Sequence, residues 1–545
     1  MGIKVADYLI KQLNKLGIEE IFGLPGDFNF EIVESIENNE NVKWIGCTNE
    51  LNAGYAADGY SRIKGYGAIL TTYGVGELSA FNAVAGCMAE NVPVIKIVGV
   101  PAIKHIKNRT LLHHNLDSAN YYAFQKAFSN IVEETLYLDF TDPKEIKEKI
   151  DNLLNTMVKT KKPVYLALPM DVCSIILEDS DYKIIEEKSD EKNLSLAIDE
   201  IIEEIKSSKK PCVIGDILTT RFQAKEELTR FLEKTKIPST SFLRGMDLIN
   251  YKTKNYLGVY CGKIANLVCY NYINTSDCVI LSGSVISDLN TLGFDFKFNL
   301  EKSILINPKN VVIKNRVFEN VLIKDLLKNL EEKIDFEFKE SLETNYYYEK
   351  SSIEKEENLT CEYIYTRLNE FLKEDDIFVT EVGLVPFGAI PMKFPKNVSV
   401  QNQLLWGSIG WATPCLEGCA LADKSRRPIL VTGDGSHQLT AQEVSTMLRN
   451  NLKPIIFVIN NSGYTVERIL CDDPEYDYNN IAQWDYSKLP EVFRGDCFST
   501  KVKTNKEFDE VLDKIEKLQE EKMCYVELVT DYMDIPKLAK AISKH

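Results

Sequence analysis

Apolar runs of strand length alternate with amphipathic helical stretches along the whole chain. The clearest example is Pro428–Asn461, PILVTGDGSHQLTAQEVSTMLRNNLKPIIFVINN, which predicts a strand, a glycine turn, a helix and a second strand. Residues 70–99 repeat this order, with a G-x-G turn after the first strand and a proline break before the second. The repetition predicts two copies of one α/β fold, although any two βαβ units share this order.

The middle of the chain carries the same alternation. Residues 210–216, 277–284 and 302–308 predict short strands, and residues 223–235 predict an amphipathic helix. No glycine-rich turn in this part matches a dinucleotide fingerprint, so we expect no bound FAD or NAD there. At the amino end, lysines interrupt the apolar positions of residues 1–17, which favours an amphipathic helix over a signal peptide.

Two charged stretches with few core residues, 177–193 and 331–358, divide the 545 residues. We therefore predict three domains, at residues 1–180, 190–335 and 355–545, each close to the usual domain size. The predicted fold class is α/β, with mainly parallel sheets flanked by helices, and the first and third domains share one fold.

Charge and cysteine usage narrow the partners and the compartment. The formal net charge is -17, which argues against nucleic acid and anionic membrane surfaces as partners. The thirteen cysteines are odd in number and form no C-x-x-C pair, which indicates reduced thiols in a cytoplasmic protein. No apolar stretch is long enough to span a bilayer.

The Pro428–Asn461 unit also carries candidate chemistry. A right-handed crossover makes its two strands parallel, so Asp434 and Asn461 should meet at the carboxyl edge of the sheet. Carboxylate and amide oxygens together with ligand phosphates are what Mg2+ prefers. The glycines Gly433 and Gly435 let the backbone approach a phosphate closely. The pattern predicts a metal-diphosphate site.

This pattern, a G-D-G-S turn followed by paired asparagines, resembles the diphosphate motif of thiamine-diphosphate enzymes. The resemblance implies thiamine diphosphate as cofactor and Mg2+ bound by Asp434, Asn461 and the Gly463 carbonyl. A second segment, NELNAGYAADGYSR, ends a predicted strand at Glu50 and resembles the part of the family that binds the aminopyrimidine ring. It implies that Glu50 promotes deprotonation of the cofactor. Without this resemblance, a lone glutamate at a strand end would be expected to be a solvent-exposed side chain without a catalytic role.

Further segments extend the resemblance over essentially the whole chain. The segment LLWGSIGWATP at residues 404–414 resembles the part of the family that holds the aminopyrimidine, and Thr72 aligns with residues lining the same cleft. The implied first domain binds the aminopyrimidine and the third binds the diphosphate. The complete expected cofactor-binding set is Glu50, Thr72, Gly407, Ile409, Gly433, Asp434, Gly435, Ser436, Asn461, Gly463 and Tyr464.

Three acid-base motifs narrow the resemblance to one branch. Asp27 lies in a Pro-Gly turn, His113 and His114 are adjacent, and Glu467 follows the paired asparagines. A turn alone explains Asp27, and adjacent histidines in a loop are usually incidental. Together they resemble the non-oxidative 2-oxo acid decarboxylases of the pyruvate and indolepyruvate type. The resemblance implies that these groups transfer protons after CO2 has left, a task that suits histidine.

The implied function is non-oxidative decarboxylation of a 2-oxo acid to an aldehyde and CO2. The implied assembly is a homodimer or homotetramer, with each active site between the first domain of one subunit and the third domain of another. The alternatives are a strict pyruvate decarboxylase, a carboligase of the acetolactate synthase type, a thiamine-dependent oxidase and a non-catalytic cofactor-binding protein. The histidine pair and the lack of a flavin fingerprint disfavour the carboligase. A yellow, FAD-containing protein would support the oxidase, and the presence of Glu50 and the histidines argues against the non-catalytic protein.

The resemblance also maps an acyl pocket. It consists of Leu289, Val382, Pro386, Phe387, Val466 and Leu470, with Met533 on a C-terminal helix as a further contributor. Strict pyruvate enzymes carry bulky aromatic residues where this chain has Leu289 and Pro386, so we expect branched-chain or aromatic 2-oxo acids to be accepted as well as pyruvate or better. His437 replaces an apolar residue of the family, and we expect a neutral packing residue there.

Overall fold

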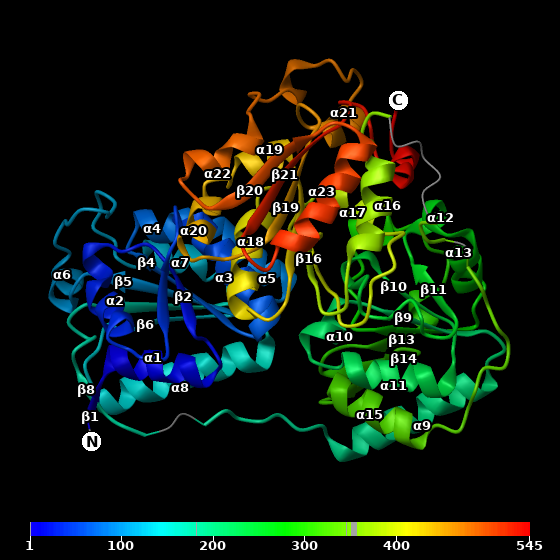
Figure 1. The fold of residues 1–545 in the computed structure, drawn as a ribbon. Coiled ribbons are helices and arrows are strands. Elements are labelled where there is room, and N and C mark those ends of the chain that lie inside the picture. Colours follow the sequence, from blue (N-terminus) through cyan, green and yellow to red (C-terminus); the bar gives the residue numbers. More distant parts are fainter. Residues whose placement is uncertain (1, 181–182, 345, 350–356) are drawn as a thin grey trace.

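The computed structural model describes residues 2–180, 183–344, 346–349 and 357–545. Three large β-sheets organise these residues into three α/β units (Figure 1), and a small two-stranded sheet completes the first unit. The predicted boundaries at residues 180, 190 and 335 fall between the sheets, and the predicted boundary at residue 355 lies outside the described residues. Among the described residues, no helix has both the length and the apolarity needed to cross a bilayer.

The first and third sheets have the same topology. The first sheet has the order β3-β2-β4-β5-β7-β6 and the third has the order β17-β16-β18-β19-β21-β20, with parallel pairing throughout. Numbered within each domain, both orders are 2-1-3-4-6-5, which confirms that the two domains share one fold. The strands are β2 (Glu20–Gly23), β3 (Lys43–Gly46), β4 (Gly67–Thr72), β5 (Val94–Val100), β6 (Glu134–Tyr137), β7 (Val164–Pro169), β16 (Ile377–Thr380), β17 (Ser399–Gln401), β18 (Pro428–Gly433), β19 (Ile455–Asn460), β20 (Cys497–Val502) and β21 (Met523–Val529).

The central sheet is mixed. Its order is β11-β10-β9-β12-β13-β14-β15, and the last two strands run antiparallel to their neighbours. The predicted strands and the predicted helix of this region are confirmed. The strands are β9 (Pro211–Gly215), β10 (Ser239–Ser241), β11 (Tyr256–Val259), β12 (Cys278–Ser282), β13 (Ile304–Ile306), β14 (Asn310–Ile313) and β15 (Arg316–Glu319).

The amino-terminal segment is helical as predicted, but the helix begins only at Val5. The residues before it form β1 (Gly2–Lys4), which pairs with β8 (Ile176–Glu178) at the end of the first domain. The helices of the first domain are α1 (Val5–Lys15), α2 (Phe30–Glu37), α3 (Glu50–Lys64), α4 (Val75–Ser79), α5 (Phe81–Glu90), α6 (Ile103–Asn108), α7 (Ala123–Phe128) and α8 (Pro143–Thr160).

Helices also cover the other two sheets (Figure 1). Those of the central domain are α9 (Glu191–Ser207), α10 (Ile217–Arg221), α11 (Lys225–Thr235), α12 (Gly262–Ala265), α13 (Leu267–Asn274), α14 (Asp288–Thr291) and α15 (Ile323–Lys333). Those of the third domain are α16 (Cys361–Phe371), α17 (Val385–Ala389), α18 (Ala412–Ala422), α19 (Asp434–Gln438), α20 (Glu443–Arg449), α21 (Thr465–Leu470), α22 (Leu489–Val492) and α23 (Asn505–Leu518).

Helices α3 and α18 join the first domain to the third. A Cβ placed on Gly59 would lie 2.1 Å from the carbonyl oxygen of Cys415, and one on Gly418 would lie 1.9 Å from that of Ala56. The two helices therefore touch backbone to backbone, a contact that only glycine permits. One buried cluster contains residues of both domains, so this crossing fixes how the two halves of the chain are placed.

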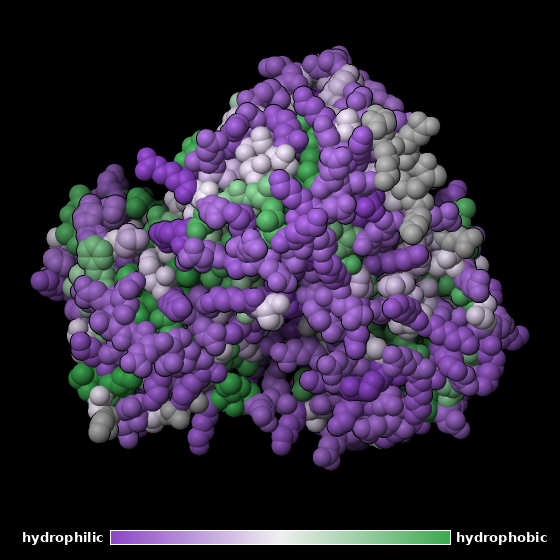
Figure 2. Space-filling model, in the orientation of Figure 1, coloured by the Kyte–Doolittle hydropathy of each residue, from purple (hydrophilic) through white to green (hydrophobic). Residues whose placement is uncertain are grey.

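The outer surface is mostly hydrophilic, and in the view of Figure 2 hydrophobic side chains gather only in small separate groups. Some exposed apolar side chains lie in or close to the segments expected to bind the cofactor. Val75 and Leu78 on α4 are 54% and 44% exposed, Trp406 is 41% exposed, and Leu439 after α19 is 45% exposed.

Candidate active site

The metal-diphosphate pattern lies at the carboxyl edge of the third sheet. Strand β18 ends at Gly433, directly beside Ile459 of the parallel strand β19, so Asp434 and Asn461 follow neighbouring strand ends as predicted. The Asp434 carboxylate is buried and accepts hydrogen bonds from the Gly435 N–H at 2.8 Å and the Gly463 N–H at 3.1 Å. The turn and the following loop are thus tied together through one side chain.

The Asn461 amide completes a set of oxygens. One terminal atom of this amide lies 2.9 Å from the Gly463 carbonyl oxygen and 3.2 Å from Asp434 Oδ1, and the other lies 2.9 Å from Thr465 Oγ1. With nitrogen in the first position these contacts are hydrogen bonds. With the amide oxygen in that position, the oxygens of Asn461, Gly463 and Asp434 face one another, and they can bind a divalent cation together. The donor set therefore fits Mg2+.

Burial raises the pKa of Asp434 to about 6, against the lowering effect of the Gly435 and Gly463 N–H groups and of the Arg468 charge. Arg468 also holds the loop, because its guanidinium donates to the carbonyl oxygens of Asn461 and Ser462. A cation bound beside Asp434 would favour the ionised carboxylate that it needs as a ligand.

Glycine is required at two positions of this loop. Gly463 has φ 142°, and a Cβ on it would lie 2.3 Å from the Asn479 carbonyl oxygen. A Cβ on Gly435 would lie 2.5 Å from the Tyr464 ring. Because the Tyr464 ring lies so close to the G-D-G turn, no side chain fits at position 435.

A cleft opens above this turn, and all its lining residues come from the third domain. Eleven of the predicted residues line it: Val382, Ile409, Gly433, Asp434, Gly435, Ser436, Asn461, Gly463, Tyr464, Val466 and Glu467. Cys361, Tyr365 and Asp534 line it as well, although no sequence motif pointed to them. The Asp534 carboxylate accepts from the Cys361 N–H at 2.5 Å and so joins the C-terminal segment to α16.

Glu50 lies on the first domain. The predicted strand does not reach it, because β3 ends at Gly46 and a short turn precedes the helix α3, whose first residue is Glu50. The Asn49 side chain caps this helix by accepting from the Asn52 N–H at 2.8 Å. A Cβ on Gly76 would lie 3.0 Å from Glu50 Oε1 and 3.1 Å from Thr72 Cγ2, so Gly76 leaves room for two predicted site residues.

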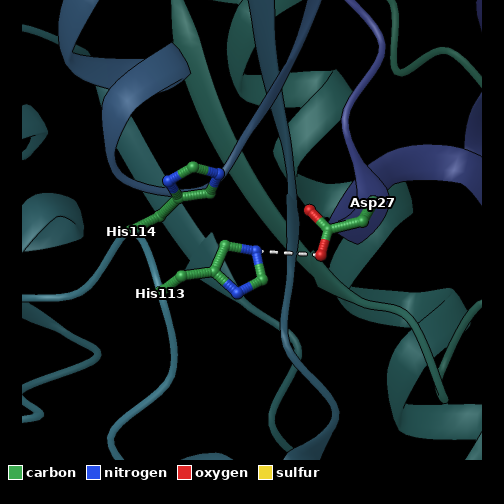
Figure 3. A group of neighbouring side chains, drawn as sticks. All are labelled: Asp27, His113 and His114. Atoms are coloured by element: carbon green, nitrogen blue, oxygen red, sulfur yellow. Dashed lines mark ion pairs between the residues drawn. The ribbon is translucent and has the colours of Figure 1, made fainter.

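Asp27, His113 and His114 form one group on the same domain (Figure 3). His113 Nε2 lies 2.9 Å from Asp27 Oδ2, and the His113 ring stacks on Phe28 with the centroids 4.8 Å apart. The His114 ring meets that of His113 edge-on at 4.5 Å. The first G-x-G turn supports this loop, since a Cβ on Gly74 would lie 2.1 Å from the His114 carbonyl oxygen.

The structure does not bring every predicted residue to the cleft of its own chain. Asp27, Glu50, Thr72, His113, His114 and Gly407 are absent from the cleft lining, and so are Leu289, Pro386, Phe387 and Leu470. Pro386 and Phe387 are buried in α17, whereas Leu289 on α14 and Leu470 at the end of α21 are 39% and 40% exposed. Met533 was expected on a helix, but it lies in the turn before the 3-10 helix Lys537–Ala541.

His437 is more than a packing residue. Its ring is fully buried, with Nδ1 2.9 Å from Thr413 Oγ1 and Nε2 2.8 Å from the Tyr525 hydroxyl. Burial lowers the pKa of His437 to about 3. The imidazole is therefore neutral, as expected, and it links α18 to β21 directly behind the G-D-G turn.

Glu90 joins all three domains next to the 404–414 segment, and the sequence analysis missed it. Its Oε1 accepts from the Leu405 N–H at 2.8 Å and the Trp406 N–H at 3.1 Å, while Arg244 Nη2 of the central domain lies 2.6 Å from Oε2. Both Glu90 and Arg244 are buried. Burial opposes ionisation, but Arg244 and Arg62 prevail and lower the pKa of Glu90.

Three parts of the chain match models of one protein family. Residues 3–125 match the family described as "Thiamine pyrophosphate enzyme, N-terminal TPP binding domain", residues 198–332 match its "central domain", and residues 382–528 match its "C-terminal TPP binding domain".

Several fungal enzymes are similar over nearly the full length. Pyruvate decarboxylase of Candida glabrata is 34% identical over 551 residues, covering 98% of this chain and 96% of that protein. Pyruvate decarboxylase isozyme 3 of Saccharomyces cerevisiae is 34% identical over 546 residues, with the same coverage of 98% and 96%. Pyruvate decarboxylase of Aspergillus fumigatus is 33% identical over 542 residues, covering 97% and 94%.

Proposed function

Because the chain belongs to the thiamine-diphosphate-dependent 2-oxo acid decarboxylases, we propose that Asp27, Glu50, His113, His114 and Glu467 carry its acid-base chemistry. The enzyme is a carboxy-lyase that uses thiamine diphosphate and Mg2+. The observation that carries the residue assignment is the Asp27–His113 ion pair at 2.9 Å, with His114 beside it. Together these groups offer a carboxylate and two imidazoles for proton transfer.

Asp434, Asn461 and the Gly463 carbonyl would hold Mg2+, and Gly433, Gly435, Ser436 and Tyr464 would surround the diphosphate. The convergence of the Asp434, Asn461 and Gly463 oxygens supports this assignment. Gly407 and Ile409 would hold the aminopyrimidine, with Thr72 beside it. When bound, the cofactor supplies an electron sink for the carbanion that decarboxylation leaves.

Each acid-base group has a distinct task in this proposal. Glu50 would accept and return a proton at the aminopyrimidine. Asp27, His113 and His114 would deliver a proton to the carbon that loses CO2 and assist release of the aldehyde. Glu467 lines the cleft near the expected position of the substrate carboxylate, where it would take part in protonation of the intermediate.

The assembly in this proposal is a homodimer or homotetramer with active sites between subunits. Two observations support it. Among the described residues, those that line the diphosphate cleft all belong to the third domain, while Glu50 and the Asp27–His113 pair lie on the first domain and outside that lining. Moreover, apolar side chains at the expected cofactor segments, Val75, Leu78 and Leu439, are exposed in the single chain. The cytoplasmic location inferred from cysteine usage stays a prediction.

The substrate in this proposal is a branched-chain or aromatic 2-oxo acid, accepted as well as pyruvate or better. The small side chains Val382 and Val466 support it, because both line the cleft together with Glu467. The fungal relatives are named for pyruvate, which makes a strict pyruvate decarboxylase the second candidate.

An aldehyde-release assay tests the proposal. The panel is pyruvate, 2-oxoisovalerate, 4-methyl-2-oxopentanoate, phenylpyruvate and indolepyruvate, each with and without thiamine diphosphate and Mg2+. We expect activity only with both additions and the highest kcat/KM on a larger acid. Glu50→Gln should abolish turnover while the protein still binds the cofactor. A marked preference for pyruvate would refute the substrate proposal, and a fully active Glu50→Gln enzyme would refute the catalytic assignment.

A further inference from the structure

Two buried glutamates meet where the first and third domains join. Glu417 on α18 and Glu443 on α20 are both 0% exposed, and an oxygen of each lies within 4.8 Å of the other and of Cys47 Sγ. Both oxygens of Glu417 and Oε1 of Glu443 have no hydrogen-bond partner among the described residues. Unpaired buried carboxylate oxygens are costly, so their presence requires an explanation.

The fourth oxygen of the pair is heavily used. Glu443 Oε2 accepts from Thr48 Oγ1 at 2.5 Å, from the Thr48 N–H at 3.3 Å and from Asn52 Nδ2 at 2.7 Å. These three donors stabilise a negative charge on Glu443. In the described part of the chain Glu417 has no such donors. Two ionised carboxylates this close in a buried site repel strongly.

We propose that Glu417 and Glu443 share one proton, and that this acid-carboxylate pair positions the turn that carries Glu50. Thr48 and Asn52 stand two residues before and two residues after Glu50, and both are bound by Glu443. Glu443 is thus a positioning residue that acts from the third domain on the first. The inference rests on the catalytic role proposed above for Glu50.

The surrounding charges agree with one shared proton. Burial first, and then the Glu443 charge, raises the pKa of Glu417 well above its usual value, and only the Arg449 cation opposes this rise. Burial and the same two carboxylates also raise the pKa of the Cys47 thiol, which keeps it neutral. A proton placed between Glu417 and Glu443 Oε1 leaves the pair with a single charge, located where Thr48 and Asn52 donate.

A metal ion is the competing occupant of this cluster. Zn2+ prefers four ligands and a thiolate, whereas the cluster offers two carboxylates and a thiol whose ionisation is disfavoured. A proton needs neither a fourth ligand nor an ionised thiol. The geometry therefore favours the proton.

Infrared difference spectroscopy of the holoenzyme at neutral pH tests the proton directly. We expect a protonated carboxylic acid band in the wild type that disappears in Glu417→Gln. The exposed Glu374→Gln variant is the matched control and should leave this band unchanged. A difference spectrum that contains only ionised carboxylate bands would overturn the shared proton, and so would one equivalent of Zn2+ that Cys47→Ser removes.

The pH dependence of unfolding provides a second readout. Above about pH 5 the unfolded chain has both glutamates ionised, while the native wild type keeps one extra proton. Wild-type stability should therefore fall with rising pH relative to Glu417→Gln, by up to about tenfold per pH unit in the unfolding equilibrium constant. Parallel pH profiles for the two proteins would contradict the proposal.

Kinetics test the positioning role. Glu443→Leu removes the acceptor for Thr48 and Asn52, and kcat should fall about 10²-fold at little cost in KM, because small displacements of a catalytic group cost this much. Glu443→Gln keeps an acceptor oxygen and should restore most of kcat. If Glu50→Gln is fully active, the catalytic role of Glu50 is refuted, while the infrared result on the shared proton still holds. If Glu50→Gln is inactive and Glu443→Leu has the wild-type kcat, only the positioning role is refuted.

Discussion

His113 Nε2 and Asp27 Oδ2 lie 2.9 Å apart, although Asp27 lies between strands β2 and β3 and His113 follows strand β5. Phe28 fixes the pair by stacking on the His113 ring. The carboxylate thus orients the imidazole, so the two side chains act as one proton-transfer unit.

Coupling between these two residues can be measured. Asp27→Asn and His113→Gln should each lower kcat at least about 10²-fold, the usual contribution of a general acid or base. The double variant should fall little further, because either change disables the same unit. Steady-state aldehyde release gives kcat, and a fluorescence titration should find thiamine diphosphate affinity unchanged. Multiplicative losses would mean that the two groups act independently.

The sequence was sufficient to predict which site residues lie close together where they directly follow neighbouring parallel strands. Asp434 and Asn461 were predictable as neighbours because parallel strands joined by one crossover end at the same edge. The Asp27–His113 distance was not predictable in this way, since it depends on how the loop after β5 packs against Gly74. Cys361 and Asp534 reach the cleft from opposite ends of the third domain, and no local pattern links them. In the sequence Glu90 is a polar residue at a helix end like many others. Its buried ion pair with Arg244 becomes evident only in the structure.

Removal of the metal should abolish activity reversibly. Chelation followed by dialysis should inactivate the enzyme, and recovery should require both Mg2+ and thiamine diphosphate. Asp434→Ala should weaken Mg2+-dependent cofactor binding at least about tenfold, because a buried charged ligand is lost. Isothermal titration measures the affinity, and the exposed Asp513→Asn on α23 is the control. Unchanged affinity in Asp434→Ala would place the metal elsewhere.

His437 should make the fold sensitive to acid. The buried ring has a pKa of about 3, whereas an unfolded histidine titrates near 6.5, so the unfolded chain binds the extra proton between these values. Its contribution to the free energy of unfolding should therefore be lost as pH falls below about 6.5, by up to about 1.4 kcal/mol per pH unit. Denaturant unfolding of wild type and His437→Gln from pH 7 to 4.5 measures this difference, with His105→Gln as the control. A difference that does not change with pH would contradict the neutral buried ring.

Loss of the Glu90 carboxylate should destabilise the junction of the domains. Glu90→Gln leaves the buried Arg244 cation without its partner, which costs about 3–5 kcal/mol. Arg244→Met in the same protein should recover much of this loss, because the unpaired charge is then absent. Thermal unfolding of the single and double variants checks both statements, and a double variant less stable than Glu90→Gln would disprove the explanation.

The size of the Val466 side chain should set the substrate range. A Cβ placed on Gly383 would lie 3.9 Å from Val466 Cγ1. Both residues line the cleft, as does Glu467. A phenylalanine at this position would fill the space needed by a branched acyl chain. Val466→Phe should therefore lower kcat/KM for 4-methyl-2-oxopentanoate relative to pyruvate by at least about tenfold, since one methylene is worth about 1–3 kcal/mol in such a pocket.

The matched control for this substitution is Val492→Phe, which adds the same ring at a side chain that is 70% exposed on α22. It should leave the kcat/KM ratio of the two acids unchanged. If Val466→Phe also leaves the ratio unchanged, the acyl chain does not extend along this wall. The pocket would then be formed by Leu289, Pro386 and Phe387, which do not line the cleft of their own chain.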